Sequence, residues 1–288
     1  MPAAPLNRRA FLVGANAVLL TACAGTGSGS DTLGHLRHGK GPEPVVVLHE
    51  WLGDHTNYTP VLPYLSEDRF SYAFADLRGY GLSKAMTGRY SAAEAAADVL
   101  ALADRLGWQR FHVVGHSMSG MIAQYLALTA QERVKSVVAI SPVPASGFKT
   151  DDAGRKRLAA VIDDDDAARA AYEARGGKRN NRAWLDRKLA ITRQSATREA
   201  MLGYLDMFTG TDFAAQAKGL TTPVSAIVGE HDLPLYREES VRKLFEPLYP
   251  NFAVAVDHEA GHYSMLETPV LLAALVERAL TNPPVGKG

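Results

Sequence analysis

Residues 115–120 read Gly-His-Ser-Met-Ser-Gly, directly after a short β-branched run and directly before an apolar helical segment. A serine on a sharp strand-to-helix turn has a strained backbone and requires small neighbours. The usual pattern is G-x-S-x-G, but Ser119 takes the second glycine position here and Gly120 follows it. This layout predicts that Ser117 is a nucleophile, and a buried serine in an ordinary turn is the alternative.

A serine hydroxyl needs an adjacent base, and that base needs an orienting carboxylate. In one known arrangement the acid and then the histidine follow the serine along the chain, each on a loop after a strand. The apolar run 224–229 is followed by Asp232, and the run 252–256 is followed by His262, just before the last helical segment. The order predicts a triad of Ser117, Asp232 and His262.

Other residues near these positions are alternatives. His258 lies four residues before His262, but Gly261 before His262 and the apolar helix after it favour His262 as the base. Glu230 and Asp257 could replace Asp232, which the strand end favours.

The elements that must position these residues alternate between apolar strands and helical segments, which is typical of a doubly wound, mostly parallel α/β sheet. Helical segments are expected at 95–106, where Ser91 and Glu94 form a capping box, and at 118–130, 239–248 and 267–280. From about 144 to 219 the composition becomes charged and helical, which predicts an inserted helical cap. Strands are expected at Pro44–His49, Ser71–Asp76, Phe111–His116, Val134–Ser141, Val224–Gly229 and Phe252–Val256, with a short hairpin strand within Thr32–His38.

From residue 42 to its C-terminus the chain resembles the α/β-hydrolase superfamily, and within it the capped arylesterases, cofactor-free haloperoxidases and enol-lactonases. The resemblance implies that Ser117 is the nucleophile, His262 the base and Asp232 the acid. It rests on five motifs in order: His-Glu-Trp at 49–51, Asp-Leu-Arg-Gly-Tyr-Gly-Leu-Ser at 76–83, the segment 115–120, Gly-Glu-His-Asp at 229–232 and Gly-His at 261–262.

An oxyanion hole requires two backbone N–H groups, one of them from the residue after the nucleophile, which is Met118. The resemblance places the second donor at Trp51, because the family usually has His-Gly before it. In this chain Glu50 replaces that glycine. We hypothesise that Glu50 hydrogen-bonds the resting Ser117 or polarises the site, and a carboxylate satisfied by loop amides is the alternative.

These residues predict a serine hydrolase that cleaves a carboxylic ester or lactone through an acyl-enzyme on Ser117, without a cofactor. The same triad could support perhydrolysis and so halide oxidation, and a surface-tethered small-molecule binding protein with little turnover is a third reading. Epoxide hydrolases and haloalkane dehalogenases carry aspartate where this chain has Ser117, so neither of these two activities is expected.

Composition excludes several other classes of function. Lys plus Arg and Asp plus Glu both total 31, so charge balance gives no reason to expect nucleic-acid binding. The acidic run Asp163–Asp166 is typical of a helix N-terminus, and no metal site is expected. Cys23 is the only cysteine, which rules out an intramolecular disulfide. The partner expected is a small molecule, and the oligomeric state stays open.

The N-terminus resembles an export signal. Paired arginines at 8–9 precede a short apolar run, which resembles a twin-arginine signal, and Leu20–Cys23 resembles a lipobox. We therefore expect an export signal at 1–23 with lipidation at Cys23, a flexible Gly/Ser-rich linker at 24–31 and the hydrolase domain at 32–288. This predicts a lipid-anchored or periplasmic protein of the bacterial cell envelope, or a cytoplasmic enzyme if the N-terminus is not a signal.

Overall fold

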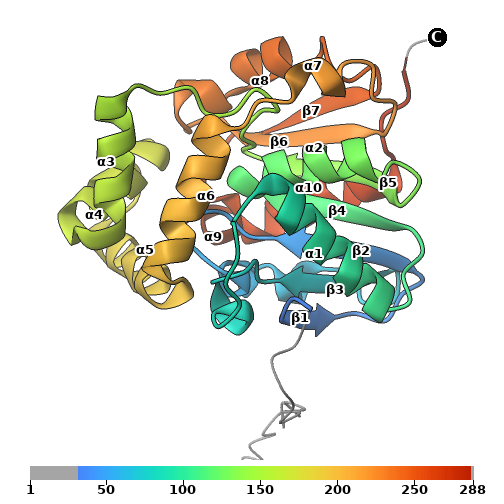
Figure 1. Cartoon of the computed structure of the whole chain (residues 1–288), viewed down its shortest axis with the longest axis horizontal. Helices are drawn as coiled ribbons and strands as arrows, with labels where there is room; N and C mark the ends of the chain where they lie inside the picture. The colour runs from blue at the N-terminus through green and yellow to red at the C-terminus, as the bar shows by residue number, and fades with distance from the viewer. Residues whose placement is uncertain (1–31, 287–288) are drawn as a thin grey trace, which may run out of the picture.

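A computed structural model describes residues 32–286 and shows a seven-stranded sheet with helices on both faces (Figure 1). The strand order is β1-β3-β2-β4-β5-β6-β7, and only β1 runs antiparallel to its neighbour. This confirms the doubly wound, mostly parallel α/β fold. The strands are β1 His35–His38, β2 Glu43–Leu48, β3 Phe70–Ala75, β4 Phe111–His116, β5 Val134–Ile140, β6 Val224–Gly229 and β7 Phe252–Asp257.

The central strands are buried on both faces, which explains their continuous apolar composition. Each residue of β4 and of β6 is buried. Observed strand ends agree with the sequence expectation to within about one residue, and the hairpin strand expected within 32–38 is the four-residue β1. The predicted export signal and Cys23 lie outside the described residues.

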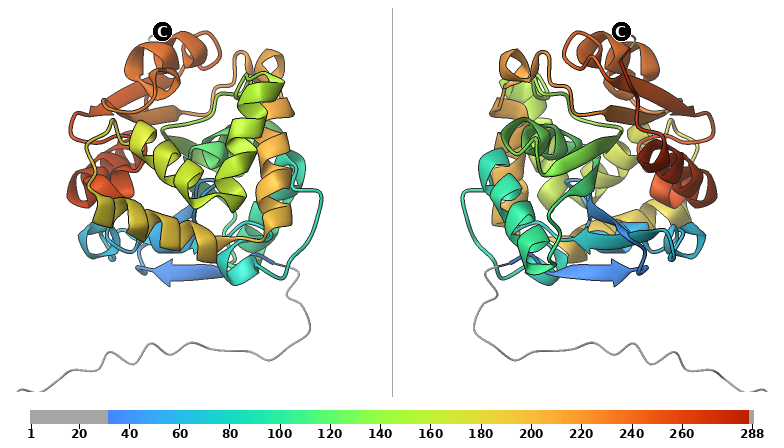
Figure 2. Two further views of the ribbon diagram at one scale, coloured as in Figure 1. Left: turned by 90° about the vertical axis from the view of Figure 1, so that its left-hand side faces the viewer. Right: turned by 90° about the vertical axis from the view of Figure 1, so that its right-hand side faces the viewer.

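Helices α1 (Ala92–Arg105) and α2 (Met118–Thr129) cover one face of the sheet, and α10 (Pro269–Thr281) covers the other (Figure 2, right). The side chain of Ser91 caps α1 by accepting a 3.1 Å hydrogen bond from the N–H of Glu94. The Glu94 carboxylate does not complete a capping box. It instead accepts from the N–H groups of Arg89 and Tyr90, so the expected reciprocal bond is replaced by bonds to the preceding loop.

The last helical segment differs from the single helix expected at 267–280. Two helices occur here, α9 (Ser264–Glu267) and α10, and Thr268 separates them with φ −138° and ψ 55°. Pro269 explains the break, because proline disfavours the helical conformation in the residue before it and has no N–H to continue the ladder. The observed α8 spans Glu238–Phe245.

Five helices lie between β5 and β6, where the insertion was expected. They are α3 Asp152–Asp163, α4 Asp165–Arg175, α5 Arg182–Ser195, α6 Arg198–Gly210 and the short α7 Ala214–Ala217. We call α3 to α6 the cap, and Figure 2 (left) shows these four helices together at one end of the sheet. Asp164 is the N-cap of α4, and Asp165 and Asp166 occupy its first turn, as the helix dipole favours.

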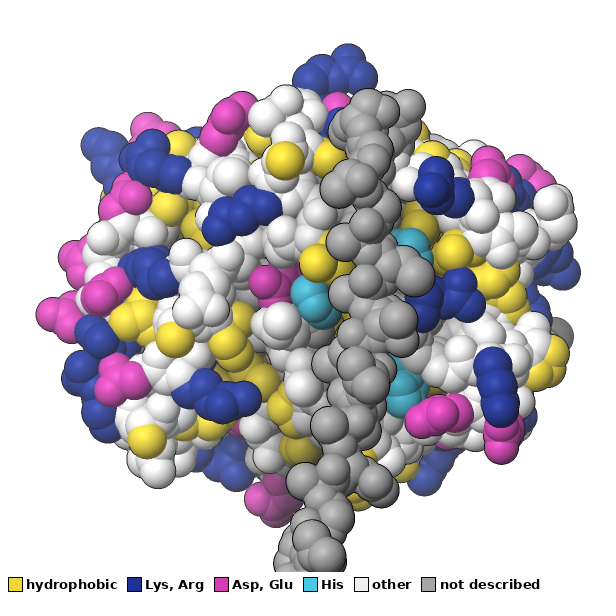
Figure 3. Space-filling model, turned by 90° about the horizontal axis from the view of Figure 1, so that it is seen from below, with side chains coloured by type: hydrophobic (Ala, Val, Ile, Leu, Met, Phe, Trp, Pro, Cys, Tyr) yellow, Lys and Arg dark blue, Asp and Glu magenta, His cyan; other side chains and the backbone are white. Residues whose placement is uncertain are grey.

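Within residues 32–286, no helix is long and apolar enough to cross a membrane. The same residues contain no group of three or more His, Cys, Asp or Glu side chains that could hold a metal ion. On the face shown in Figure 3, basic and acidic side chains are interspersed.

Candidate active site

Ser117 lies between β4 and α2 with φ 55° and ψ −113°, a conformation that side chains rarely adopt. Glycines make this turn possible. A Cβ on Gly115 would lie 2.2 Å from the carbonyl oxygen of Ser119, and a Cβ on Gly120 would lie 2.6 Å from Pro142. Ser119 tolerates a side chain because its hydroxyl turns back and donates to the carbonyl of His49 on the neighbouring strand end.

His262 and Asp232 form a buried pair at the ends of β7 and β6. The distance from His262 Nδ1 to Asp232 Oδ2 is 2.6 Å, and the two residues are 2% and 0% exposed. A carboxylate can only accept, so Nδ1 carries the proton and Nε2 of the neutral ring is left as a base. The N–H of Leu233 donates a second hydrogen bond to Asp232.

Ser117 and His262 line the same small cavity, which has a volume of about 20 Å³. Tyr236 also lines it. Burial raises the pKa of Tyr236, so its hydroxyl stays protonated. Its ring lies 4.7 Å from the ring of His262.

Both expected oxyanion donors, Trp51 and Met118, line this cavity beside Ser117. Neither backbone N–H hydrogen-bonds another described residue, so both are available to a ligand. The carbonyl of Trp51 accepts a 2.9 Å hydrogen bond from the hydroxyl of Tyr80, which fixes the peptide plane after it.

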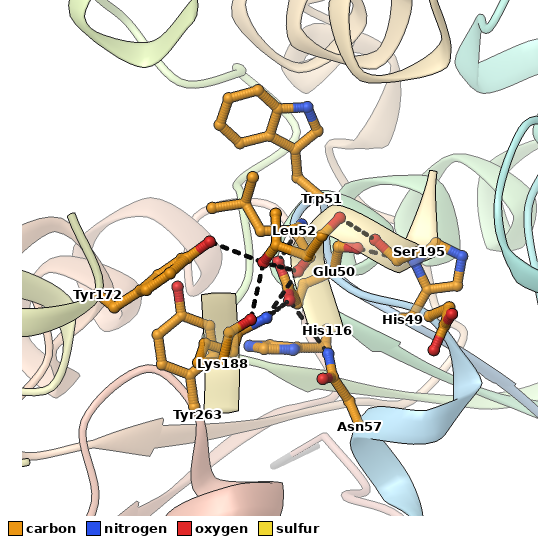
Figure 4. Close-up of polar contacts among 12 residues, drawn as sticks. His49, Glu50, Trp51, Leu52, Asn57, His116, Tyr172, Lys188, Ser195 and Tyr263 are labelled. Atoms are coloured by element: carbon orange, nitrogen blue, oxygen red, sulfur yellow. Dashed lines mark hydrogen bonds and ion pairs between the residues drawn. The ribbon is translucent and has the colours of Figure 1, made fainter. Parts of the chain in front are cut away.

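The carboxylate of Glu50 accepts hydrogen bonds from three partners, and Ser117 is not one of them. Lys188 on α5 donates to it at 2.7 Å, Asn57 donates at 3.1 Å, and the N–H of Leu52 donates as well (Figure 4). The side chains of Lys188 and Glu50 are 0% and 3% exposed. Burial acts to raise the pKa of Glu50, but the charge of Lys188 and the hydrogen bonds from Lys188 and Leu52 lower it to about 2.

The cap holds the turn 49–52 through further hydrogen bonds. Lys188 Nζ also donates to the carbonyl of Leu52 at 2.7 Å, and Thr192 donates to the same oxygen at 2.6 Å (Figure 4). The indole N–H of Trp51 donates to the carbonyl of Met201 on α6 at 2.8 Å. The position of the Trp51 N–H therefore depends on α5 and α6.

The alternative acids and base have other partners. His258 pairs with Glu230 at 2.6 Å on the surface, where their side chains are 75% and 53% exposed. Asp257 is buried and accepts a 2.5 Å hydrogen bond from Thr268. Neither Asp257 nor the Glu230–His258 pair takes part in the hydrogen bond between Asp232 and His262.

Two further histidines support the site. His116 Nε2 donates to the carbonyl of His262 at 2.8 Å, and burial keeps the pKa of His116 well below its ordinary value. His49 donates from Nδ1 to the carbonyl of Glu50 and accepts from the N–H of Leu77 at Nε2. Through these hydrogen bonds the two rings fix the loops that carry His262 and Trp51.

Sequence reasoning missed three residues of the site, namely Lys188, Tyr236 and Arg175. Lys188 had a detectable signal, because it shares a helical face with the apolar Leu185 and Leu189, where a lysine is costly unless it is paired. No spacing rule points to Tyr236 or Arg175, which the loop after Asp232 and the end of α4 bring to the cavity.

Comparisons with known proteins agree with this architecture. The family model described as alpha/beta hydrolase fold matches residues 43–175. The chain is 38% identical to the dihydrolipoyllysine-residue acetyltransferase component of the acetoin cleaving system of Cupriavidus necator, over 38% of this chain but only 29% of that protein. It is 27% identical to the pimeloyl-(acyl-carrier protein) methyl ester esterase of Aeromonas hydrophila, over 84% of this chain and 96% of that protein.

Among solved structures, the enol-lactonase of Burkholderia xenovorans superposes with a TM-score of 0.71 and 23% identity. The match covers 86% of this chain and 96% of that one. At this identity the likeness concerns the fold. The strand order, the turn at Ser117 and the family model agree, and the chain therefore has the α/β-hydrolase fold.

Proposed function

We propose that the protein is a serine hydrolase that cleaves a carboxylic ester or lactone through an acyl-enzyme on Ser117. One observation carries the proposal. A serine in a left-handed turn lines a cavity together with a histidine, and Nδ1 of that histidine is hydrogen-bonded to a buried carboxylate. Serine becomes a useful nucleophile when such a base is beside it.

In the proposed reaction, His262 Nε2 takes the proton of Ser117 as the hydroxyl oxygen attacks the substrate carbonyl. The N–H groups of Met118 and Trp51 stabilise the resulting oxyanion. His262 then protonates the leaving alcohol, or the alkoxide of an opened lactone. Water attacks the acyl-enzyme by the same route, and the acid product and free Ser117 result.

Two relatives support this chemistry by their names, one a methyl ester esterase and the other an enol-lactonase. Each of these two proteins aligns with this chain over 96% of its own length. They support the choice of ester and lactone carbonyls, and the leaving group is left to experiment.

The test is labelling by a fluorophosphonate probe together with hydrolysis of short acyl esters and lactones. We expect the probe to label Ser117 in folded protein, and Ser117→Ala to abolish both labelling and turnover. A folded wild-type protein that neither reacts with the probe nor hydrolyses any ester or lactone would overturn the proposal. Bromide oxidation in acetate buffer, measured in parallel, distinguishes perhydrolysis.

We also propose that the N-terminal segment directs export and lipidation at Cys23. The paired arginines and the lipobox-like run support this. Expression of the full chain in a bacterium that exports lipoproteins tests it. Cys23→Ala should lose the lipid mass and the membrane association, and an unchanged mass and distribution would contradict the proposal.

A further inference from the structure

The cavity beside Ser117 is too small for a complete substrate. Its volume of about 20 Å³ accommodates about one ordered water. A second cavity of about 510 Å³ lies in the cap between α3 and α4. Phe148, Leu158 and Arg175 line both cavities, so Arg175 stands at the junction between the catalytic groups and the cap cavity.

The cap cavity combines an apolar wall with positive charge. Alanine, valine, leucine and phenylalanine form most of its lining, and two arginines, Arg157 and Arg175, supply its charge. None of the residues that line this cavity is acidic. In the described part of the chain, neither arginine has a carboxylate within 4.0 Å. Such a cavity fits a ligand with an apolar body and a negative charge.

Arg175 has most of its donors free. Its side chain donates one hydrogen bond of 3.3 Å, from Nη1 to the carbonyl of Ala171 in its own helix. A guanidinium carries five N–H donors and stays charged, and its planar fork matches a carboxylate. Arg175 is partly exposed at the junction of the two cavities and has no carboxylate beside it in the described residues, so the carboxylate of a ligand that enters the cavity can pair with its fork.

The acids near Arg175 already have partners. The Glu50 carboxylate is neutralised by Lys188 at 2.7 Å. Asp232 accepts from His262 and from the N–H of Leu233, each at 2.6 Å. The carbonyl of Arg175 accepts from the N–H of His262 at 3.0 Å, which holds the end of α4 against the loop of the base.

We propose that Arg175 binds a carboxylate of the substrate, which is then an ester or lactone with an apolar body in the cap cavity and a free carboxylate at Arg175. This inference rests on the proposed function and narrows it. Charge-assisted, bidentate hydrogen bonds between guanidinium and carboxylate orient the scissile carbonyl toward Ser117.

The test compares two 4-nitrophenyl esters with acyl groups of equal length, the neutral pentanoate and the glutarate hemiester, which carries a free carboxylate. We expect the wild type to favour the hemiester. Arg175→Met should lower kcat/KM for the hemiester about 10- to 100-fold and leave that for pentanoate within about threefold, because a charged hydrogen bond is lost with only one substrate. Arg175→Lys should restore part of the preference.

Arg198→Met is the matched control, since Arg198 is a cap arginine that pairs with Asp163 at the surface and lines neither cavity. This variant should leave kcat/KM unchanged for both esters. Equal losses on both esters in Arg175→Met, with a shifted pH profile, would mean that Arg175 serves the Asp232–His262 pair, which overturns the inference. A wild type without preference for the hemiester overturns it too.

A binding measurement separates failure of this inference from failure of the proposed function. Calorimetric titration of glutarate into Ser117→Ala should show binding that Arg175→Met in the same background loses, whether or not the wild type hydrolyses esters. Circular dichroism checks that each variant is folded. Absence of glutarate binding in folded Ser117→Ala contradicts the inference, while probe labelling at Ser117 still decides the function independently.

Discussion

Lys188 on the cap and Glu50 in the turn after β2 form a buried ion pair of 2.7 Å. Glu50 is hydrogen-bonded to Lys188 of the cap and not to Ser117, and the next residue is the expected oxyanion donor Trp51. The Glu50 carboxylate thus connects the turn to α5. It also accepts hydrogen bonds from the N–H of Leu52 and from the side-chain amide of Asn57. The hypothesis that Glu50 hydrogen-bonds Ser117 has no support in this arrangement.

Lys188→Met should lower the free energy of unfolding by about 3–5 kcal/mol, because it leaves the Glu50 carboxylate buried without its counter-charge. Urea denaturation measures this effect. Lys149→Met is the control, since the pair of Lys149 with Asp212 is largely exposed and should contribute at most about 1 kcal/mol. If adding Glu50→Gln to Lys188→Met recovers none of the loss, the buried charge is not its cause.

The Glu50 carboxyl should also make stability depend on pH. Its pKa in the folded protein is about 2, below the ordinary value of 4.5, so the folded state favours the ionised form. This contribution, about 3 kcal/mol, is complete above about pH 5 and is lost as the pH falls toward 2. Denaturation of wild type and Glu50→Gln between pH 7 and 3 should show the wild-type advantage shrinking below pH 5. A constant difference across that range would contradict the assignment.

Asp232→Asn should reduce kcat for ester hydrolysis by about 10⁴-fold, because an amide no longer selects the tautomer with the proton on His262 Nδ1. Steady-state kinetics measures this loss. Glu230→Gln is the matched control, since Glu230 precedes the same loop but pairs with His258 at the surface. A comparable loss of kcat in Glu230→Gln would indicate that Glu230, and not Asp232, is the acid.

Ser119→Gly should destabilise the protein by about 2 kcal/mol, although it restores the usual G-x-S-x-G pattern. The change removes the hydrogen bond to the carbonyl of His49 and places a glycine in the first turn of α2. Thermal unfolding measures it. Ser119→Ala removes only the hydrogen bond and should lie between the wild type and Ser119→Gly, and a stabilised Ser119→Gly would refute the explanation.

The sheet and the order of the proposed triad could be predicted because both depend on local patterns. Buried parallel strands are continuously apolar, and a strand end fixes where the next loop residue lies. The strand-to-helix turn at Ser117 could be expected for the same reason, since the glycines that allow its close backbone contacts, Gly115 and Gly120, lie within three residues of it.

The cap contacts could not be predicted, because they join residues far apart in the sequence. Lys188 lies 138 residues from Glu50, and periodicity gives the face of a helix but not its position over the sheet. The break between α9 and α10 was predictable in principle from Pro269, whose effect on Thr268 outweighed the helical pattern around it.

At Ser117, the left-handed backbone lowers stability at the position proposed to provide the nucleophile. A side chain in this conformation lowers the stability of the folded state by about 1–3 kcal/mol, and a glycine avoids this strain. Glycine in turn makes the unfolded chain more flexible, which lowers stability by about 0.4–1 kcal/mol. Ser117→Gly should therefore unfold at a higher temperature than the wild type while being inert toward esters. Stability alone would favour glycine at this position, and the strained serine is what the proposed nucleophilic role requires.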